Sequence, residues 1–119
     1  MNEISAKELY KLYYDTIAKC CTFNLNSYSD DELFYNLFEE FDIGVHSFFH
    51  DMSLARLSKS SLIDDVALNL SKKIREKWLS LSGSICDKTI TAEQIKTDIA
   101  WQDLFSLCDQ LKSRLDGLK

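Results

Sequence analysis

The chain has 119 residues, of which 45% are apolar and 28% are charged, and it contains no proline. At this length and composition we expect one globular domain, residues 1–119, with one hydrophobic core. The formal net charge of −5 argues against a nucleic-acid partner, because binding to phosphates requires clustered lysine and arginine. No apolar run approaches the roughly 20 residues of a membrane span, so we expect no membrane partner. The polar residues after Met1 do not form a secretion signal, and we expect a cytoplasmic protein.

The charges are distributed unevenly along the chain. Residues 30–51 contain seven acidic residues and neither lysine nor arginine, whereas residues 52–82 contain six basic residues and three acidic ones. A folded segment with charges of one sign can project a negative field from one face. A helix surface that is simply solvated has the same composition, and this alternative stays open.

The four cysteines are Cys20, Cys21, Cys86 and Cys108. None of them has the CxxC spacing of a metal finger or a thioredoxin-like site. For a cytoplasmic protein we expect reduced thiols. Cys20 and Cys108 fall on apolar helix faces and are predicted to pack as small hydrophobic residues.

Residues near the N-terminus predict the first helix. Ser5 and Glu8 have the spacing of a capping box, in which two side chains satisfy N–H groups left free at a helix start. Apolar residues then recur at steps of three and four, as on one buried helix face: Leu9, Leu12, Tyr13, Ile17 and Cys20. Residues 22–29 lose this periodicity and are rich in turn-forming residues, so we expect a loop there.

A second helix is predicted to begin at Asp30, with Ser29 as its N-cap and three carboxylates in its first turn. Its apolar residues recur at about 100° per residue: Phe34, Leu37, Phe38, Phe41, Val45, Phe48, Phe49 and Met52. Because they stay in phase across Gly44, we favour one helix from Asp30 to about Ser53, with a break or kink at Gly44 as the alternative. An interior glycine costs a helix about 1 kcal/mol relative to alanine.

The second half of the chain predicts two more long helices. Residues 54–60 are expected to form a linker before a helix that Gly83 ends, with the apolar face Ile63, Val66, Ala67, Leu70, Ile74, Trp78 and Leu81. Residues 84–90 are expected to form a second loop. A capping box at Thr91 starts a turn or two ending near residues 97–98, and the last helix buries Trp101, Leu104, Phe105, Cys108, Leu111 and Leu115. No segment alternates apolar and polar residues, so we predict an all-α, single-domain bundle of four to five amphipathic helices.

The most distinctive polar arrangement is Asp42, His46 and His50, at positions i, i+4 and i+8. On the predicted second helix they share the polar face with Glu32, Tyr35, Asn36 and Glu39. Two imidazoles and a carboxylate on successive turns could hold a divalent transition metal. The residue after His46 is serine, however, where a zinc protease of the HExxH type has its glutamate. We therefore expect surface histidines, whose cationic form the carboxylates favour, and no metal site.

The chain contains no motif of a known catalytic site. It has three glycines, too few for a phosphate-binding GxxxxGK or GxGxxG loop, and it has no GxSxG turn. The adjacent carboxylates Asp64 and Asp65 lie at a helix start, where the helix dipole explains them without catalysis. We predict that the protein is not an enzyme and uses no cofactor.

Two further groups of residues are candidates for contact with a partner. The basic residues between Lys72 and Lys77 could bind an anion, but cations on an exposed helix face also complement the helix dipole. Four tyrosines are predicted to be exposed, and tyrosine beside carboxylates is common in protein-binding surfaces: Tyr10, Tyr14, Tyr28 and Tyr35.

Two helical segments carry a resemblance to a known family. Residues 62–78 read LIDDVALNLSKKIREKW, and residues 99–109 read IAWQDLFSLCD. They resemble the mid-chain helix and the C-terminal helix, with its early tryptophan, of small all-α bacterial immunity proteins from contact-dependent growth inhibition and polymorphic toxin systems. The two segments cover about a quarter of the chain. The chain departs from the colicin-DNase immunity proteins, because Tyr13 and Tyr14 are not followed by proline, and no residue role is transferred from that group.

The resemblance implies an antitoxin that neutralises a cognate toxin, often a basic nuclease, in a one-to-one complex. Carboxylates between Asp30 and Asp51 would then face the cationic groups that the toxin uses to bind phosphate. The residues implied at the interface are Asp31, Glu32, Tyr35, Glu39, Asp42, His46 and His50. The alternative is a regulatory or adaptor bundle that binds a partner helix in a groove. Salt separates the two, because ionic screening weakens electrostatically steered binding and changes burial in a groove little.

Overall fold

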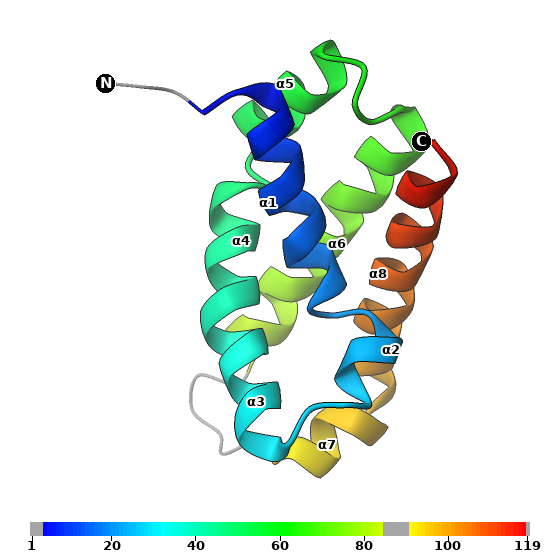
Figure 1. Ribbon diagram of the computed structural model, residues 1–119. Helices are drawn as coiled ribbons and strands as arrows, with labels where there is room; N and C mark the ends of the chain where they lie inside the picture. Colours follow the sequence, from blue (N-terminus) through cyan, green and yellow to red (C-terminus); the bar gives the residue numbers. More distant parts are fainter. Residues whose placement is uncertain (1–3, 85–90, 119) are drawn as a thin grey trace.

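The computed structural model describes residues 4–84 and 91–118, except for the side chains of Phe23 and Ser84. Long helical segments run alternately in opposite directions along the molecule (Figure 1). They are α1 (Ala6–Ala18), a continuous segment made of α3 (Asp30–Tyr35), the π-helical turn η1 (Asn36–Phe41) and α4 (Asp42–Ser47), then α6 (Asp65–Ser84) and α8 (Ile99–Gly117). The described ranges contain no strand. The predicted all-α bundle is therefore confirmed.

Shorter helices lie at the two ends of this bundle. Helix α5 (Asp51–Lys59) packs against α1 and α6 at the end where both termini lie. Helices α2 (Thr22–Leu25) and α7 (Ala92–Thr97) lie at the opposite end and pack on α8. Each helix within the described ranges is too short or too polar to traverse a lipid bilayer.

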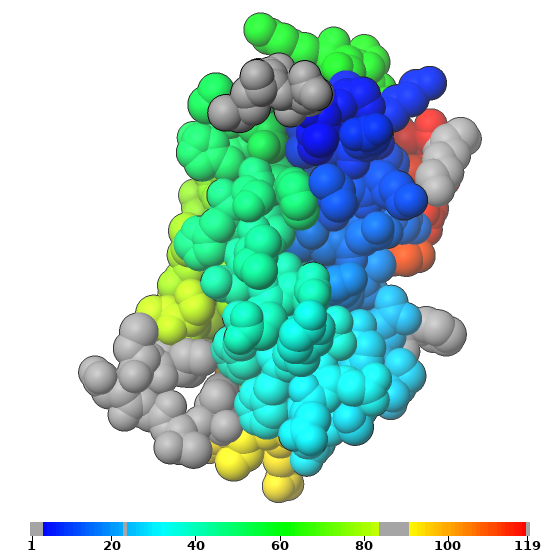
Figure 2. Space-filling view, turned by 60° about the vertical axis from the view of Figure 1, so that its left-hand side comes forward, coloured from blue at the N-terminus to red at the C-terminus, as the bar shows by residue number. Residues whose placement is uncertain are grey.

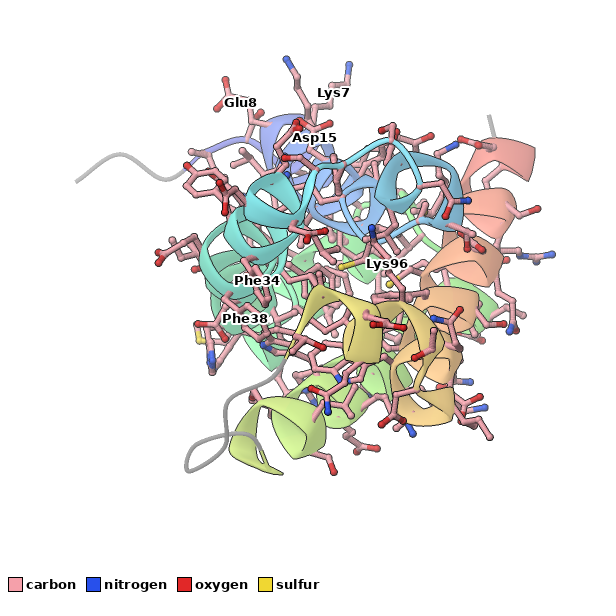
Figure 3. The ribbon with its side chains drawn as sticks, turned by 90° about the horizontal axis from the view of Figure 1, so that it is seen from below. Lys7, Glu8, Asp15, Phe34, Phe38 and Lys96 are labelled. Carbon is pink, nitrogen blue, oxygen red and sulfur yellow. The ribbon has the colours of Figure 1, made fainter. Side chains whose placement is uncertain are left out.

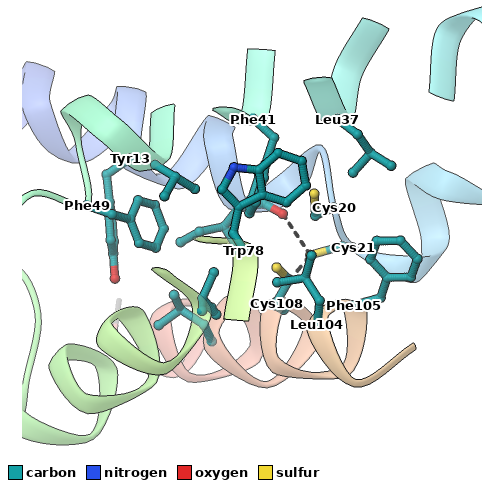
Figure 4. Packing of buried hydrophobic residues seen from close by; sticks show 14 of the residues in the cluster. Tyr13, Cys20, Cys21, Leu37, Phe41, Phe49, Trp78, Leu104, Phe105 and Cys108 are labelled. Carbon is teal, nitrogen blue, oxygen red and sulfur yellow. Dashed lines mark hydrogen bonds between the residues drawn. The ribbon is translucent and has the colours of Figure 1, made fainter. Parts of the chain in front are cut away.

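Trp78 of α6 lies at the centre of the core and is fully buried (Figure 4). Its indole ring makes edge contacts with Phe41 of η1 and Trp101 of α8, at centroid distances of 5.2 and 5.9 Å. On another side of the core Tyr13 packs against Phe49, with ring centroids 5.0 Å apart. These aromatic contacts link the long helical segments into one cluster of buried side chains.

The cysteines of the core behave as predicted. Cys20 and Cys108 are completely buried, and burial raises the pKa of the Cys20 thiol. Cys21 is also buried and donates a weak hydrogen bond to the Cys108 carbonyl, at 3.6 Å. These thiols are packed as small hydrophobic groups. Cys86 and the predicted loop of residues 85–90 lie outside the described residues.

Several predicted helix starts are confirmed by their hydrogen bonds. The Ser5 hydroxyl accepts from the Glu8 backbone N–H at 3.1 Å, and Thr91 forms a complete capping box with Gln94. Helix α7 ends at Thr97, and the carboxylate of Asp98 then caps α8 by accepting from the Ala100 N–H. All six apolar residues predicted for the last helix are buried.

The predicted linker at residues 54–60 is wrong, because most of it belongs to α5. The second helix continues through Gly44, as favoured, but it ends at Ser47 and not near Ser53. A new helix starts at Asp51, where the His50 Nδ1 atom accepts a hydrogen bond from the Met52 backbone N–H at 3.2 Å. The restart changes the helical phase, so Met52 is 74% exposed and Leu54 is buried instead.

Other expectations are corrected in detail. Residues 22–25 form the single helical turn α2 where a loop was expected. Leu12 and Val66, assigned to buried faces, are 38% and 48% exposed. Three tyrosines predicted to be exposed are half-buried against the core: Tyr10, Tyr14 and Tyr28.

Candidate protein-binding surface

Side chains of the segment α3–η1–α4 are arranged in straight rows of every fourth residue. An α-helix has about 3.6 residues per turn, so residues four apart drift steadily around its axis. In the wider π-helical turn η1, in the middle of the segment, residues four apart are displaced around the axis in the opposite direction. This displacement offsets the one that accumulates in α3 and α4. As a result four residues of the segment, spaced by four, all point inward and are at most 1% exposed: Leu33, Leu37, Phe41 and Val45.

The same register creates a row on the outer side of the segment, which we call the outer row: Asp31, Tyr35, Glu39 and Ile43. All four residues are exposed, and the two large apolar side chains, Tyr35 and Ile43, are 55% and 59% exposed. Figure 2 brings the segment forward, and it forms a large part of this face of the molecule. The outer row therefore presents carboxylates and apolar groups alternately along one helical ridge.

The π turn also fixes the position of Tyr35. Its hydroxyl donates a hydrogen bond to Glu40 Oε1 at 2.7 Å, and this bond raises the pKa of the tyrosine. Residues five apart do not face each other on an α-helix, where the neighbours are three and four residues apart. The wider turn η1 brings the two side chains together, so the exposed ring is held on the surface.

The carboxylates of this segment differ in whether the protein itself already uses them. Glu32 caps its own helix, because its Oε1 atom accepts from the Ser29 N–H while the Ser29 hydroxyl accepts from the Glu32 N–H. The Oδ1 atom of Asp30 lies 3.8 Å from Nζ of Lys96 on α7. Figure 3 labels Lys96 in a view from below. Asp31 and Glu39 of the outer row make no hydrogen bond or ion pair with any described residue. These two carboxylates are available to a partner.

Asp42 and His46, predicted to belong to the same face, lie in the next row, toward α6. Asp42 is half-buried, and its Oδ1 atom accepts a hydrogen bond from the Trp78 indole N–H at 2.8 Å. The same oxygen lies 3.3 Å from Nε2 of His46, which is exposed. The residues predicted to share one polar face thus lie in two different rows. The carboxylate of Asp42 is used inside the protein, as the hydrogen-bond acceptor of the core residue Trp78.

We expect Asp42→Ala to lower the free energy of unfolding by about 1.5 kcal/mol, because it leaves a buried indole N–H without an acceptor. Asp42→Asn keeps an oxygen at the same place and should cost less than half as much. Urea denaturation followed by circular dichroism measures both values. Equal losses for the two variants would show that the hydrogen bond to Trp78 contributes little.

His50 lies beyond the end of α4 and does not continue the row of Asp42 and His46. Its Nδ1 atom caps α5 as described, and it lines a hollow of about 230 Å³ with Val45, His46, Asp51, Arg75 and Leu79. Arg75 donates to Asp51 Oδ1 at 2.7 Å and lowers the pKa of that carboxyl. Within residues 4–84 and 91–118, no three histidine, cysteine or carboxylate side chains converge as a metal site would require.

Two phenylalanines on the side of the segment that faces α6 extend the core toward the surface. Phe34 and Phe38 stack with centroids 5.9 Å apart, and Figure 3 shows both on the same side of the segment. Phe38 in turn contacts the rings of Trp78 and Trp101. Both phenylalanines are half-buried and belong to the core, as predicted for the aromatic face of this helix.

The fold and this surface define an all-α bundle with one exposed helical ridge that is both acidic and apolar. No family model matches the chain, and no curated protein and no solved structure match it either. Three of the four outer-row residues, Asp31, Tyr35 and Glu39, are among the interface residues expected from the sequence, and Ile43 is not. Ile43 follows Tyr35 and Glu39 at the same spacing of four, but the sequence does not reveal the π turn that keeps residues at this spacing aligned.

Proposed function

We propose that this protein is an immunity protein that binds a cognate toxin, a nuclease with a basic active site, and blocks it. The observation that carries the proposal is the outer row, in which exposed apolar side chains alternate with carboxylates that have no partner among the described residues. Protein-binding surfaces commonly combine an aromatic anchor with a polar surround. The resemblance of residues 62–78 and 99–109 to helical immunity proteins supports the same function.

The mechanism is occlusion of the toxin's cationic surface. Asp31 and Glu39 would face lysine and arginine residues that otherwise contact nucleic-acid phosphates, while Tyr35 and Ile43 would bury apolar area. Complementary charge raises the association rate, and apolar burial slows dissociation. Residues 30–51 contain no lysine or arginine that would repel such a partner. The protein acts by binding and needs no catalytic residue, cofactor or metal.

The test is co-expression with the protein encoded by the neighbouring upstream reading frame, followed by native mass spectrometry. The proposal predicts a one-to-one complex and survival of cells that express both proteins. Absence of a complex, together with no protection of the cells, would reject an immunity function for this pair.

Within that complex we expect Glu39→Lys to weaken binding about tenfold at low salt, because it places a cation opposite the toxin's own cations. The matched control is Glu76→Lys, which makes the same charge change at an exposed position in the middle of α6. Isothermal titration at two salt concentrations measures both variants and the unsubstituted protein. If the two variants bound the toxin with equal affinity, the outer row would not be part of the interface.

A second candidate is an adaptor that binds a partner helix, and a groove between α6 and α8 favours it. The groove has a volume of about 650 Å³, and its apolar lining includes Val66, Leu70 and Leu118. Binding there would bury apolar area and would change little with salt. The salt dependence of the titration above therefore separates the two candidates.

A further inference from the structure

The centre of the outer row has a composition suited to one particular cationic group. Tyr35 lies one turn after Asp31 and one turn before Glu39, and the residue is 55% exposed. Glu39 is close enough to Tyr35 to raise the pKa of its hydroxyl slightly, beyond the larger effect of Glu40. An exposed aromatic ring thus stands between two carboxylates that make no internal bond among the described residues.

The tyrosine hydroxyl itself is already engaged. Because it donates to Glu40, the part of Tyr35 that is offered to a partner is the face of its ring. The face of an aromatic ring attracts cations, and a flat cation can also stack on it. The carboxylates on either side can accept hydrogen bonds from the edge of such a cation.

From this arrangement we propose that Asp31, Tyr35 and Glu39 bind an arginine side chain of the partner protein. A guanidinium group is planar, stacks on a tyrosine ring and directs its N–H donors outward in the plane, toward both carboxylates. A lysine ammonium is compact, is more strongly hydrated and cannot stack in this way. The surface therefore distinguishes arginine from lysine, although both carry the same charge. This inference rests on the proposed function, since it names the group that the outer row recognises.

The test uses two acetylated peptide amides, tetra-arginine and tetra-lysine, titrated into the 119-residue protein and followed by nuclear magnetic resonance. We expect the arginine peptide to bind about threefold more tightly than the lysine peptide. This ratio of dissociation constants corresponds to the free energy of one exposed cation–π contact. The largest changes in chemical shift should occur in the Tyr35 ring and in the side chains of Asp31 and Glu39. Equal affinities, or shifts centred on another acidic region, would overturn the inference.

Two variants separate stacking from simple charge attraction. Tyr35→Phe keeps the ring and should keep the preference for arginine, whereas Tyr35→Leu should bind both peptides equally. A preference that survives in Tyr35→Leu overturns the role of the ring. Failure here is distinct from failure of the proposed function: if the co-expressed toxin still binds and Glu39→Lys still weakens it, the immunity function stands and only the arginine contact is wrong.

Discussion

Replacing Trp78 with alanine should lower the free energy of unfolding by about 4 kcal/mol, the cost typical of removing a large buried aromatic side chain. Trp78 is fully buried, and its indole ring contacts Phe38 and Phe41 of η1 and Trp101 of α8. The substitution also leaves Asp42 without its indole donor. A domain of this size is stabilised by only about 5–15 kcal/mol in total, so a large part of its stability should be lost.

Urea denaturation followed by far-ultraviolet circular dichroism measures this loss. The control is Leu79→Ala, at the next position of α6, where the side chain is 44% exposed and should cost less than 1 kcal/mol. Similar losses for the two variants would contradict the central place of Trp78 in the core.

Replacing Gly44 with alanine should cost about 2 kcal/mol, although alanine favours a helix by about 1 kcal/mol over glycine. A Cβ atom at Gly44 would lie 2.9 Å from the Cβ of Thr16 and even closer to the ends of that side chain. Thr16 is buried and its hydroxyl donates to the Leu12 carbonyl at 2.8 Å, so it cannot easily turn away. Helices α1 and α4 would have to move apart.

Two variants test this contact between the helices. Thr16→Ala removes the two closest atoms, so the double variant should be less destabilised than the sum of the single changes. Gly83→Ala is the matched control, because no atom lies within 4 Å of a Cβ added there, and it should leave stability equal or slightly higher. Strictly additive losses at residues 16 and 44 would show that the two helices do not meet closely at this point.

The sequence predicts most of the bundle because its signals are local. Capping residues such as Ser29 and Thr91 and the apolar spacing of the last helix act within a few residues of each other, and the structure confirms them. Helix α5 was not predicted because its start depends on a histidine as N-cap, and because Met52 happens to continue the earlier apolar phase. The periodicity of the apolar residues alone therefore does not locate the break between α4 and α5 at residues 48–50.

The candidate surface was predictable only in part. The excess of carboxylates and the presence of Tyr35 are visible in the sequence, but the π turn that aligns Tyr35 with Ile43 is not apparent from a mixed spacing of three and four. The hydrogen bond between Asp42 and Trp78 joins residues 36 positions apart. Such a contact depends on how α4 packs on α6, and no local pattern reveals that the carboxylate is already in use.

The outer row as the contact surface is tested most directly by labelling carboxylates in the free protein and in its complex with the co-expressed toxin. Carbodiimide and glycine ethyl ester modify accessible carboxylates, and mass spectrometry locates the label. We expect Asp31 and Glu39 to lose most of their labelling in the complex, and we expect Glu76 and Glu93, which are exposed on α6 and α7, to be labelled as before. Unchanged labelling of Asp31 and Glu39 in a stable complex would contradict this expectation.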